Sequence, residues 1–305
     1  MFMNIRDLIY IRAVSKLKHF GKAAEVCGVS QPALSTQIKK LEQELGITLF
    51  ERDSRSVQIT DIGQDIIQLA DEALSVIDNI RATAEEARDP FSGQFRLGAI
   101  PTIAPYLLPY FIKKNYDAFP KLKLHFQEDI TERLNQALLN GELDAAILAT
   151  PSENPKLDVI RLYDEPFWAV LPTGHSLQTI DKIRTEHLPF EELLLLTEGH
   201  CFRDQALDLC QLSATLGTRS IRVTSLETLI NMVAAGQGIT LVPAMALSGS
   251  WTTDQGVFTK KLDDPNAYRR IYLTFRKRFP RRQLLENMAD LICTNLPSSV
   301  QRIAH

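Results

Sequence analysis

The sequence predicts an α/β protein in three parts: a small helical domain, one long helix, and a larger domain of alternating strands and helices. Three observations lead to this prediction. Apolar residues recur at helical spacing through residues 1–60. One apolar stripe then continues through residues 61–89 in steps of three and four, close to a coiled-coil repeat. Within residues 90–305, short apolar runs alternate with helix-like segments, which is the pattern of strand–helix units.

The composition is that of a folded protein without a disulfide framework. The chain has 305 residues, of which 45% are hydrophobic and 23% charged, enough to bury a full core. Four cysteines are too few for a disulfide scaffold and fit a reducing compartment. Arg6 and Asp7 interrupt the apolar N-terminal stretch, and Pro243 interrupts the uncharged run 228–253, so neither predicts a signal peptide or a membrane span. We therefore expect a soluble, cytoplasmic protein with no membrane partner.

Charge is unevenly distributed along the chain. Residues 1–60 hold nine lysines and arginines against six acidic residues, whereas residues 61–89 hold two against eight. The rest of the chain is balanced, with 23 residues of each sign. A polyanion such as a nucleic acid would therefore bind to the first part.

The first domain is predicted to contain three helices and a two-stranded wing. The first helix ends near Lys16, and the second is stopped by Gly28. Ser30 is a typical N-cap for the third helix, and Pro32 is tolerated in its first turn. The second and third helices then form a helix-turn-helix, whose third helix would lie in the major groove of DNA. The spacing of the apolar residues alone fits equally well a small helical subdomain with a solvated polar face that does not bind DNA.

Polar residues line the exposed face of the third helix. They are Gln31, Ser35, Thr36, Lys39 and Lys40. Glutamine, serine and threonine can read base edges, while lysines suit phosphates. The segment 50–60, with Arg52 and Arg55, is predicted to form the wing beside the phosphate backbone.

The long helix is predicted to start after Thr60, because threonine is a preferred N-cap residue, and to run to about residue 88. Its single apolar stripe and acidic remainder require a partner surface. Packing onto the rest of the chain is one option. We favour a dimerisation helix, because a helix-turn-helix that reads a palindrome needs a twofold axis.

The larger domain is predicted to be built from strand–helix units with largely parallel sheets. The strand-like runs are 94–100, 121–127, 145–148, 167–171, 193–197, 239–243 and 271–275. Helix starts follow some of these strands directly, at Thr102 and at Thr131. Ligands of open α/β sheets bind where such helix starts face the carboxyl ends of strands.

One segment carries reactive chemistry, the run 193–210. A buried apolar stretch leads into Gly199-His200-Cys201, and a helix with Arg203 and Cys210 is expected to follow. A helix start and nearby cations favour the thiolate of Cys201. Peroxide converts a thiolate to sulfenic acid, which a second thiol can condense to a disulfide.

The spacing of the two cysteines makes such a disulfide conditional. If the segment is helical, the rise of about 1.5 Å per residue places the two Cα atoms roughly 13 Å apart. A disulfide needs about 7 Å or less, so the segment would have to unfold locally. Two inert buried cysteines are the plainer alternative. A zinc site lacks a fourth ligand at a usual spacing, so we expect no metal and no cofactor.

The first domain resembles a known family almost residue by residue. Residues 23–63, AAEVCGVSQPALSTQIKKLEQELGITLFERDSRSVQITDIG, resemble the DNA-binding domain of LysR-type transcriptional regulators. The resemblance implies a winged helix-turn-helix, a linker helix that dimerises, and a regulatory domain of two α/β subdomains like periplasmic binding proteins. Subdomain I would cover 90–165 and 268–305, and subdomain II 166–267. The DNA-binding residues it implies are Ser30, Gln31, Pro32, Ser35 and Thr36, with Lys39, Arg52 and Arg55 on phosphates.

Within this family, the run TEGHC–RDQA––C resembles the hydrogen peroxide sensors. The resemblance implies that Cys201 reacts with peroxide and that Cys210 resolves the product. It also implies a set of residues around the peroxide pocket: Thr102, Thr131, His200, Arg203, Asp204 and Arg270. Arg269 could replace Arg270, both arginines could belong to a solvated basic cluster, and the threonines could merely cap helices. Cys27 and Cys293 are interpreted as packing residues.

The sequence thus predicts a peroxide-sensing, redox-switched transcription regulator that is not an enzyme. Its expected partners are palindromic half-sites in double-stranded DNA, further copies of itself in a homotetramer, hydrogen peroxide and RNA polymerase. Two alternatives remain. The regulatory domain could respond to a small carboxylate with silent cysteines, or the chain could be a thiol peroxidase fused to a DNA-binding domain.

Overall fold

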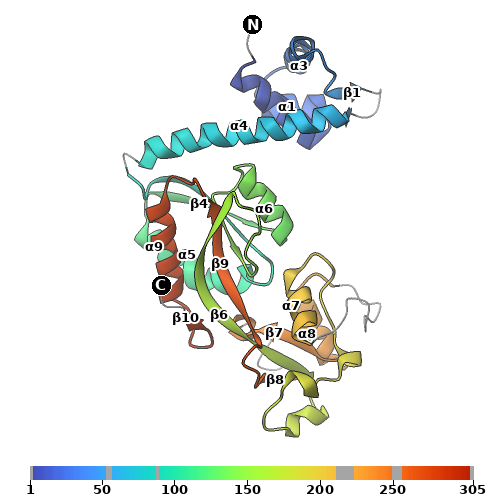
Figure 1. Cartoon of the computed structure of the whole chain (residues 1–305). Helices are drawn as coiled ribbons and strands as arrows, with labels where there is room; N and C mark the ends of the chain where they lie inside the picture. The colour runs from blue at the N-terminus through green and yellow to red at the C-terminus, as the bar shows by residue number, and fades with distance from the viewer. Residues whose placement is uncertain (1–2, 53–56, 87–88, 211–222, 249–255, 303–305) are drawn as a thin grey trace. The chain divides into compact units, whose positions relative to one another are not determined.

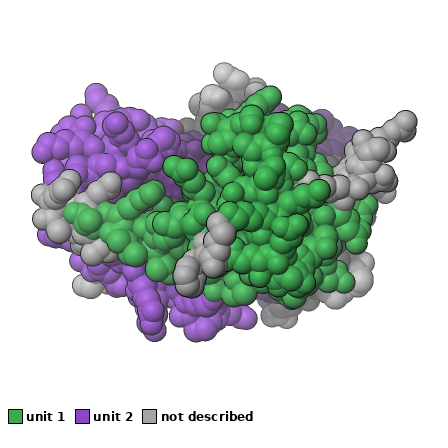
Figure 2. Space-filling view, turned by 90° about the horizontal axis from the view of Figure 1, so that it is seen from above, with its two compact units in different colours: residues 1–84, 139–142 green, residues 85–138, 143–305 purple. Residues whose placement is uncertain are grey.

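The computed structural model describes residues 3–52, 57–86, 89–210, 223–248 and 256–302. These fall into two compact units, which Figure 2 shows in different colours. Unit 1 contains residues 1–84 and 139–142, and unit 2 contains residues 85–138 and 143–305. The finer division at residues 60 and 89 remains a prediction.

Unit 1 contains the three predicted helices. They are α1 (Ile5–Leu17), α2 (Phe20–Val26) and α3 (Gln31–Leu45). The Ser30 hydroxyl accepts a hydrogen bond from the Ala33 amide and so caps α3, as predicted. Gly28 takes a positive φ of 67°, which suits the sharp turn between α2 and α3. Leu34, Ile38 and Leu41 point from α3 into a buried core with α1 and α2.

The wing is a short hairpin attached to α3. Strand β1 (Phe50–Arg52) pairs antiparallel with β2 (Val57–Ile59). The Glu42 carboxylate accepts hydrogen bonds from the amides of Leu49 and Phe50, at 2.8 and 3.1 Å. This contact fixes the start of the wing relative to the helix that precedes it.

Helix α4 (Asp61–Glu86) follows the wing as one helix of 26 residues (Figure 1). The Thr60 hydroxyl accepts a hydrogen bond from the Gly63 amide at 2.9 Å, as the N-cap prediction requires. One side of the helix, with Ile67, Ala70 and Leu74, is buried in the core of unit 1. The predicted apolar stripe lies beside this buried side and is only partly covered, because its members Leu69 and Ile80 remain 60% and 64% exposed.

Unit 2 contains a mixed sheet. Its strands are β3 (Gly93–Ala99), β4 (Leu122–Glu128), β5 (Ala145–Leu148), β6 (Leu157–Pro172), β7 (Thr240–Pro243), β8 (Val257–Lys261), β9 (Tyr268–Arg276) and β10 (Gln301–Arg302). The main strand order is β10-β6-β9-β5-β3-β4, and β7 and β8 also pair with β6. Only the pairings of β3 with β4 and with β5 are parallel among the described strands. The prediction of largely parallel sheets was wrong, because apolar runs do not encode the direction of a strand.

The long strands β6 and β9 connect two regions of unit 2 (Figure 1). Strand β6 pairs with β9 up to Pro166, and from Phe167 onwards it pairs with β7 and β8. The change of partner lies close to the subdomain crossings expected near residues 165 and 267, which remain a prediction.

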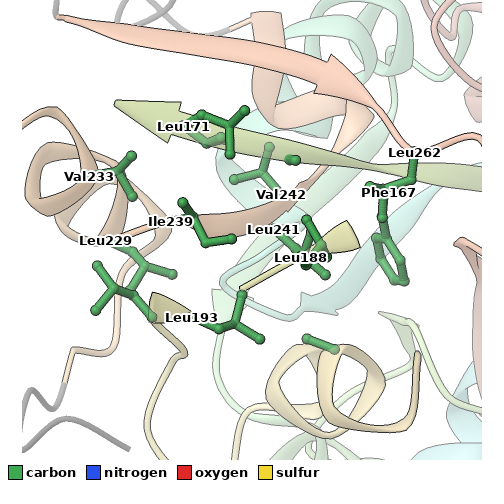
Figure 3. Close-up of a cluster of buried hydrophobic side chains, with 14 of the residues drawn as sticks. Phe167, Leu171, Leu188, Leu193, Leu229, Val233, Ile239, Leu241, Val242 and Leu262 are labelled. Atoms are coloured by element: carbon green, nitrogen blue, oxygen red, sulfur yellow. The ribbon is translucent and has the colours of Figure 1, made fainter. Parts of the chain in front are cut away.

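Helices cover the sheet at both ends of β6. They are α5 (Ala104–Ala118), α6 (Thr131–Leu139), α7 (Cys201–Leu209), α8 (Leu226–Ala234) and α9 (Arg282–Thr294), with four 3₁₀ turns at Ser176–Thr179, Thr185–His187, Phe190–Glu192 and Ala244–Ser248. In the region beyond Phe167, apolar side chains from β6, β7 and α8 form one core, with Leu171, Leu241 and Leu229 among them (Figure 3).

The run 193–197 is not a regular strand. Leu193 and Leu196 form only isolated bridges, with Ile239 and Val223. The run is apolar because Leu193, Leu194 and Leu196 are buried in the same core. Burial alone produces such a pattern, so the prediction of a strand here was wrong.

Candidate functional site

Helix α7 places the two cysteines at its opposite ends. Gly199 has a φ of 91°, a conformation that favours glycine, and turns the chain into His200, the N-cap of α7. Cys201 is the first residue of α7, and Cys210 is its C-cap. Both are free thiols, and the helical rise of about 1.5 Å per residue separates their Cα atoms by roughly 13 Å. The structure is therefore a reduced state in which these two thiols cannot bond.

A small cavity lies against Cys201. It has a volume of about 10 Å³ and is bounded by three segments: the end of β3, the start of α6 and the start of α7. The lining residues are Ile100, Pro101, Thr102, Ile130, Thr131, Gly199, His200, Cys201 and Phe202. A volume of this size corresponds to about one water molecule. The cavity joins three segments that are separate in the sequence, 100–102, 130–131 and 199–202. Three of its residues are predicted site residues besides the cysteine: Thr102, Thr131 and His200.

The Cys201 thiol is held mainly in its protonated form. Burial raises the pKa of this thiol above its ordinary value, while a hydrogen bond with Thr131 and the charge of Arg269 lower it in part. The helix start and a nearby cation favour the thiolate, as the sequence predicts, but desolvation exceeds their effect and the pKa is raised overall. Apart from its interaction with Cys201, the Thr131 hydroxyl is buried without a hydrogen-bond partner in the described chain.

The arginine behind the cavity is Arg269, not Arg270. Arg269 is buried and donates hydrogen bonds to the hydroxyl and the carbonyl of Thr102, at 2.8 and 2.9 Å. Arg270 instead pairs with Asp164 at 2.7 Å, with its side chain 31% exposed. Adjacent residues of a strand point to opposite faces, so only one of the two can reach the cavity. Placing Arg270 in the pocket was therefore wrong.

Three more predicted residues are now located. His200 is 8% exposed, lines the cavity, and has a pKa lowered by burial. Arg203 is buried on the other side of α7, where it donates to the Leu196 carbonyl at 3.3 Å. Asp204 is exposed on α7 and does not line the cavity. Neither residue lines the cavity. Arg203 supports α7 from its buried side, whereas Asp204 lies one helical turn from Cys201, where its charge raises the pKa of that thiol.

The second cysteine is less accessible than the first. Cys210 is 4% exposed, packs in the core beyond Phe167, and has a pKa raised to about 11 by burial.

The other two cysteines lie elsewhere. Cys27 is the C-cap of α2, and Cys293 is buried with its Sγ donating to the Leu162 carbonyl at 3.1 Å. Their interpretation as packing residues fits these positions.

Two family models cover most of the chain. Residues 5–64 match the model described as bacterial regulatory helix-turn-helix protein, lysR family, and residues 88–296 match the LysR substrate binding domain. This chain belongs to the LysR family. As a LysR-family protein it is a DNA-binding transcription regulator.

The relatives and solved structures described next are all named as hydrogen peroxide-inducible activators or as OxyR. The chain is 39% identical over 302 residues to the hydrogen peroxide-inducible genes activator of Dickeya chrysanthemi, covering 99% of both chains. It is similar to a full-length OxyR cysteine variant from Pseudomonas aeruginosa, with a TM-score of 0.81, 34% identity, and coverage of 100% and 99% of the two chains. A Corynebacterium glutamicum OxyR cysteine mutant with bound hydrogen peroxide matches at a TM-score of 0.66 and 33% identity, covering 97% and 93%.

In this LysR-family protein the residues predicted to bind DNA lie mostly on the open face of α3. Those that are exposed are Ser30, Gln31, Pro32, Thr36 and Lys39. Ser35 is partly buried. The Arg52 side chain and Arg55 lie outside the described residues.

The described part of the chain holds no group of three His, Cys, Asp or Glu residues placed for a metal. It also contains no helix long and apolar enough to cross a membrane.

Sequence reasoning missed the buried partner of Arg269. Glu165 is fully buried, and its carboxylate pairs with Arg269 at 2.8 Å. Its signal was present in the sequence as two acidic residues, Asp164-Glu165, and two basic residues, Arg269-Arg270, at the two expected subdomain crossings. Recognising the pairing needed the strand register, which places Glu165 opposite Arg269.

Proposed function

We propose that this protein senses hydrogen peroxide through Cys201 and converts the signal into altered DNA engagement. The observation that carries the proposal is the cavity of about 10 Å³ that brings the Cys201 thiol together with Thr102, Thr131 and His200. Two hydroxyls and an imidazole supply hydrogen bonds to both oxygens of a small, polar guest. Cys201 is the reacting group and Cys210 the resolving one.

The size of the cavity disfavours a carboxylate effector. Sites for small organic ligands have volumes of about 300 Å³ or more, whereas the space beside Cys201 fits about one water-sized molecule. Peroxide is only one oxygen larger than water. The alternative of a small carboxylate with silent cysteines therefore has no room at this site in the reduced form.

The proposed reaction has two balanced steps. The Cys201 thiol first loses its proton, and the sulfur then attacks one peroxide oxygen. The S–O bond forms as the O–O bond breaks, so sulfur gives up two electrons, and the leaving hydroxide takes up a proton to become water. Cys210 next attacks the sulfenic sulfur, forming the disulfide and releasing a second water. Over the whole first step the thiol proton passes to the leaving hydroxide, and His200, whose pKa is lowered by burial, lines the cavity in which this happens.

Formation of the disulfide in the second step requires a change in structure. Because α7 separates the cysteines, the disulfide requires α7 to unwind and Cys210 to leave its core position. This rearrangement would alter how the oligomer, a proposed dimer of dimers, engages its DNA half-sites and RNA polymerase in the cytoplasm. The chain is proposed to respond to peroxide once per switching event and not to turn it over as a thiol peroxidase.

Mass spectrometry before and after a brief peroxide pulse tests the proposal. We expect an intramolecular Cys201–Cys210 disulfide in the wild-type chain. The Cys210→Ser variant should instead stop at a Cys201 sulfenic acid that a carbon nucleophile can trap. The Cys201→Ser variant should give neither product and should still bind DNA. Peroxide-dependent DNA engagement in Cys201→Ser would overturn the assignment, and rapid turnover of peroxide with a reductant would favour the thiol peroxidase alternative.

A further inference from the structure

Two ion pairs cross between β6 and β9 at successive positions, where the strands pass from one region of unit 2 to the other (Figure 1). Asp164 is opposite Arg270, and Glu165 is opposite Arg269. The pairs occupy opposite faces of the strands. The Asp164–Arg270 side chains are 20% and 31% exposed, whereas those of Glu165 and Arg269 are 0% and 1% exposed. One pair is therefore a surface ion pair, and the other lies inside the protein, where Arg269 contacts the cavity residue Thr102.

The buried carboxylate of Glu165 is held from two elements. One of its oxygens accepts a hydrogen bond from the Arg269 Nε at 2.8 Å, and the other accepts from the Met245 amide at 2.7 Å. Met245 lies in the 3₁₀ turn that follows β7. An ionised carboxylate without water is costly unless it is paired and hydrogen-bonded, and Glu165 meets both conditions. Its position is thus fixed by its partners.

The same pair fixes the guanidinium of Arg269. Three contacts hold it: Nε to Glu165, Nη1 to the Thr102 hydroxyl and Nη2 to the Thr102 carbonyl. The guanidinium also lies 5.4 Å from the ring centroid of Phe202, the residue after Cys201. Because a guanidinium is planar and rigid, holding its Nε edge determines where its two terminal nitrogens point.

The contact with Arg269 sets the direction of the Thr102 hydroxyl. An arginine can only donate hydrogen bonds, so the Thr102 oxygen acts as an acceptor toward it. The hydroxyl hydrogen is left to point elsewhere, and Thr102 lines the cavity. The Thr102 hydroxyl is therefore able to donate a hydrogen bond to a guest in the cavity.

We propose that Glu165 is a positioning residue for the peroxide reaction: it anchors Arg269, which in turn holds the Thr102 hydroxyl as a donor to the leaving oxygen. The inference rests on the proposed function of Cys201. When the sulfur forms its bond to one peroxide oxygen, the O–O bond breaks and negative charge develops on the other oxygen, which leaves as hydroxide. A donor aimed at that oxygen stabilises the transition state.

The test compares two reagents that attack the same thiol. Peroxide has a hydroxide leaving group that needs a donor, whereas iodoacetamide releases iodide, which does not. The ratio of the two rate constants at one pH cancels the thiolate fraction of Cys201. We expect Glu165→Gln to lower this ratio about 10- to 100-fold, the usual effect of removing a residue that orients a reacting group. Both rates are measured on the full-length protein by mass spectrometry of the Cys201 peptide.

Asp164→Asn is the matched control, because it removes the same charge from the adjacent pair on the opposite face. Its ratio should stay within about twofold of wild type. If Glu165→Gln fails to fold, Glu165→Asp retains the charge but shortens the reach to Arg269, and it should also lower the ratio. An unchanged ratio in the Glu165 variants, or an equal fall in Asp164→Asn, overturns the role of Glu165. A wild-type Cys201 that is alkylated but never oxidised by peroxide overturns the proposed function itself.

Discussion

The residues around Cys201 have opposing effects on the pKa of its thiol. Burial raises its pKa, and Thr131 and Arg269 oppose that effect. The negative charge of the nearby Asp204 raises the pKa of Cys201 further. A mostly protonated thiol is protected from random oxidation, since the thiolate is the nucleophile. The groups proposed to take part in the reaction, Thr102, Thr131 and His200, nevertheless line the cavity together with Cys201.

The raised pKa of Cys201 predicts a specific pH dependence. Below the pKa of a thiol, the thiolate fraction rises about tenfold per pH unit. Because the pKa of Cys201 lies above its ordinary value, its alkylation by iodoacetamide should keep rising between pH 7 and pH 9 without levelling off. Stopped-time alkylation with peptide mass spectrometry measures this profile. A plateau reached below pH 8 would mean that Arg269 and Thr131 outweigh burial.

Helix α7 is the element that must change. Phe202, Ala206 and Cys210 lie on its buried side and pack into the core beyond Phe167. On the same helix, the Gln205 side chain donates to the Ala149 carbonyl at 2.8 Å and so attaches α7 to the end of β5. Forming the disulfide closes a loop of about ten residues, which is worth at most roughly 3 kcal/mol. This gain is offset by the packing lost, so the oxidised form should be easily reduced.

Amide hydrogen exchange should therefore rise within residues 201–210 when the disulfide forms. The helical hydrogen bonds of α7 must open to bring the two sulfurs together, whereas β3 (Gly93–Ala99) keeps its ladder with β4 and β5. Exchange measured by mass spectrometry on reduced and oxidised protein gives the comparison, with β3 as the internal reference. Equal exchange in α7 in both states would show that the cysteines pair without unwinding.

At the scale of the whole molecule, DNA binding and thiol chemistry occupy different units. The predicted DNA-binding residues lie in unit 1, and the cavity lies entirely in unit 2. A signal must therefore pass through the oligomer or through α4. The exposed apolar side chains of α4, Leu69, Val76 and Ile80, are each more than half exposed in the single chain. We propose a second copy of the chain as the partner that covers them, because a regulator that reads a palindrome needs a twofold axis.

Leu69→Glu should weaken self-association. A charge on this exposed apolar face would be buried against the partner helix, at a cost of roughly 1–3 kcal/mol. The dimer should therefore dissociate at about 5- to 150-fold higher concentration. Analytical ultracentrifugation measures the change. Gln68→Glu adds the same charge at the neighbouring exposed position and should have little effect. Identical association of both variants with wild type would place the dimer contact elsewhere.

The sequence by itself determined the features that depend on local order. The helix-turn-helix, the caps at Ser30 and Thr60 and the nine-residue separation of Cys201 and Cys210 follow from neighbouring residues, because helix periodicity and capping are short-range effects. Only the tertiary structure decided strand direction, the choice of Arg269 over Arg270 and the role of Glu165. These depend on strand register and on burial, which involve residues about a hundred positions apart. The tertiary structure also decided the direction of the pKa shift of Cys201, because desolvation is set by the packed surroundings and not by the residues adjacent in sequence.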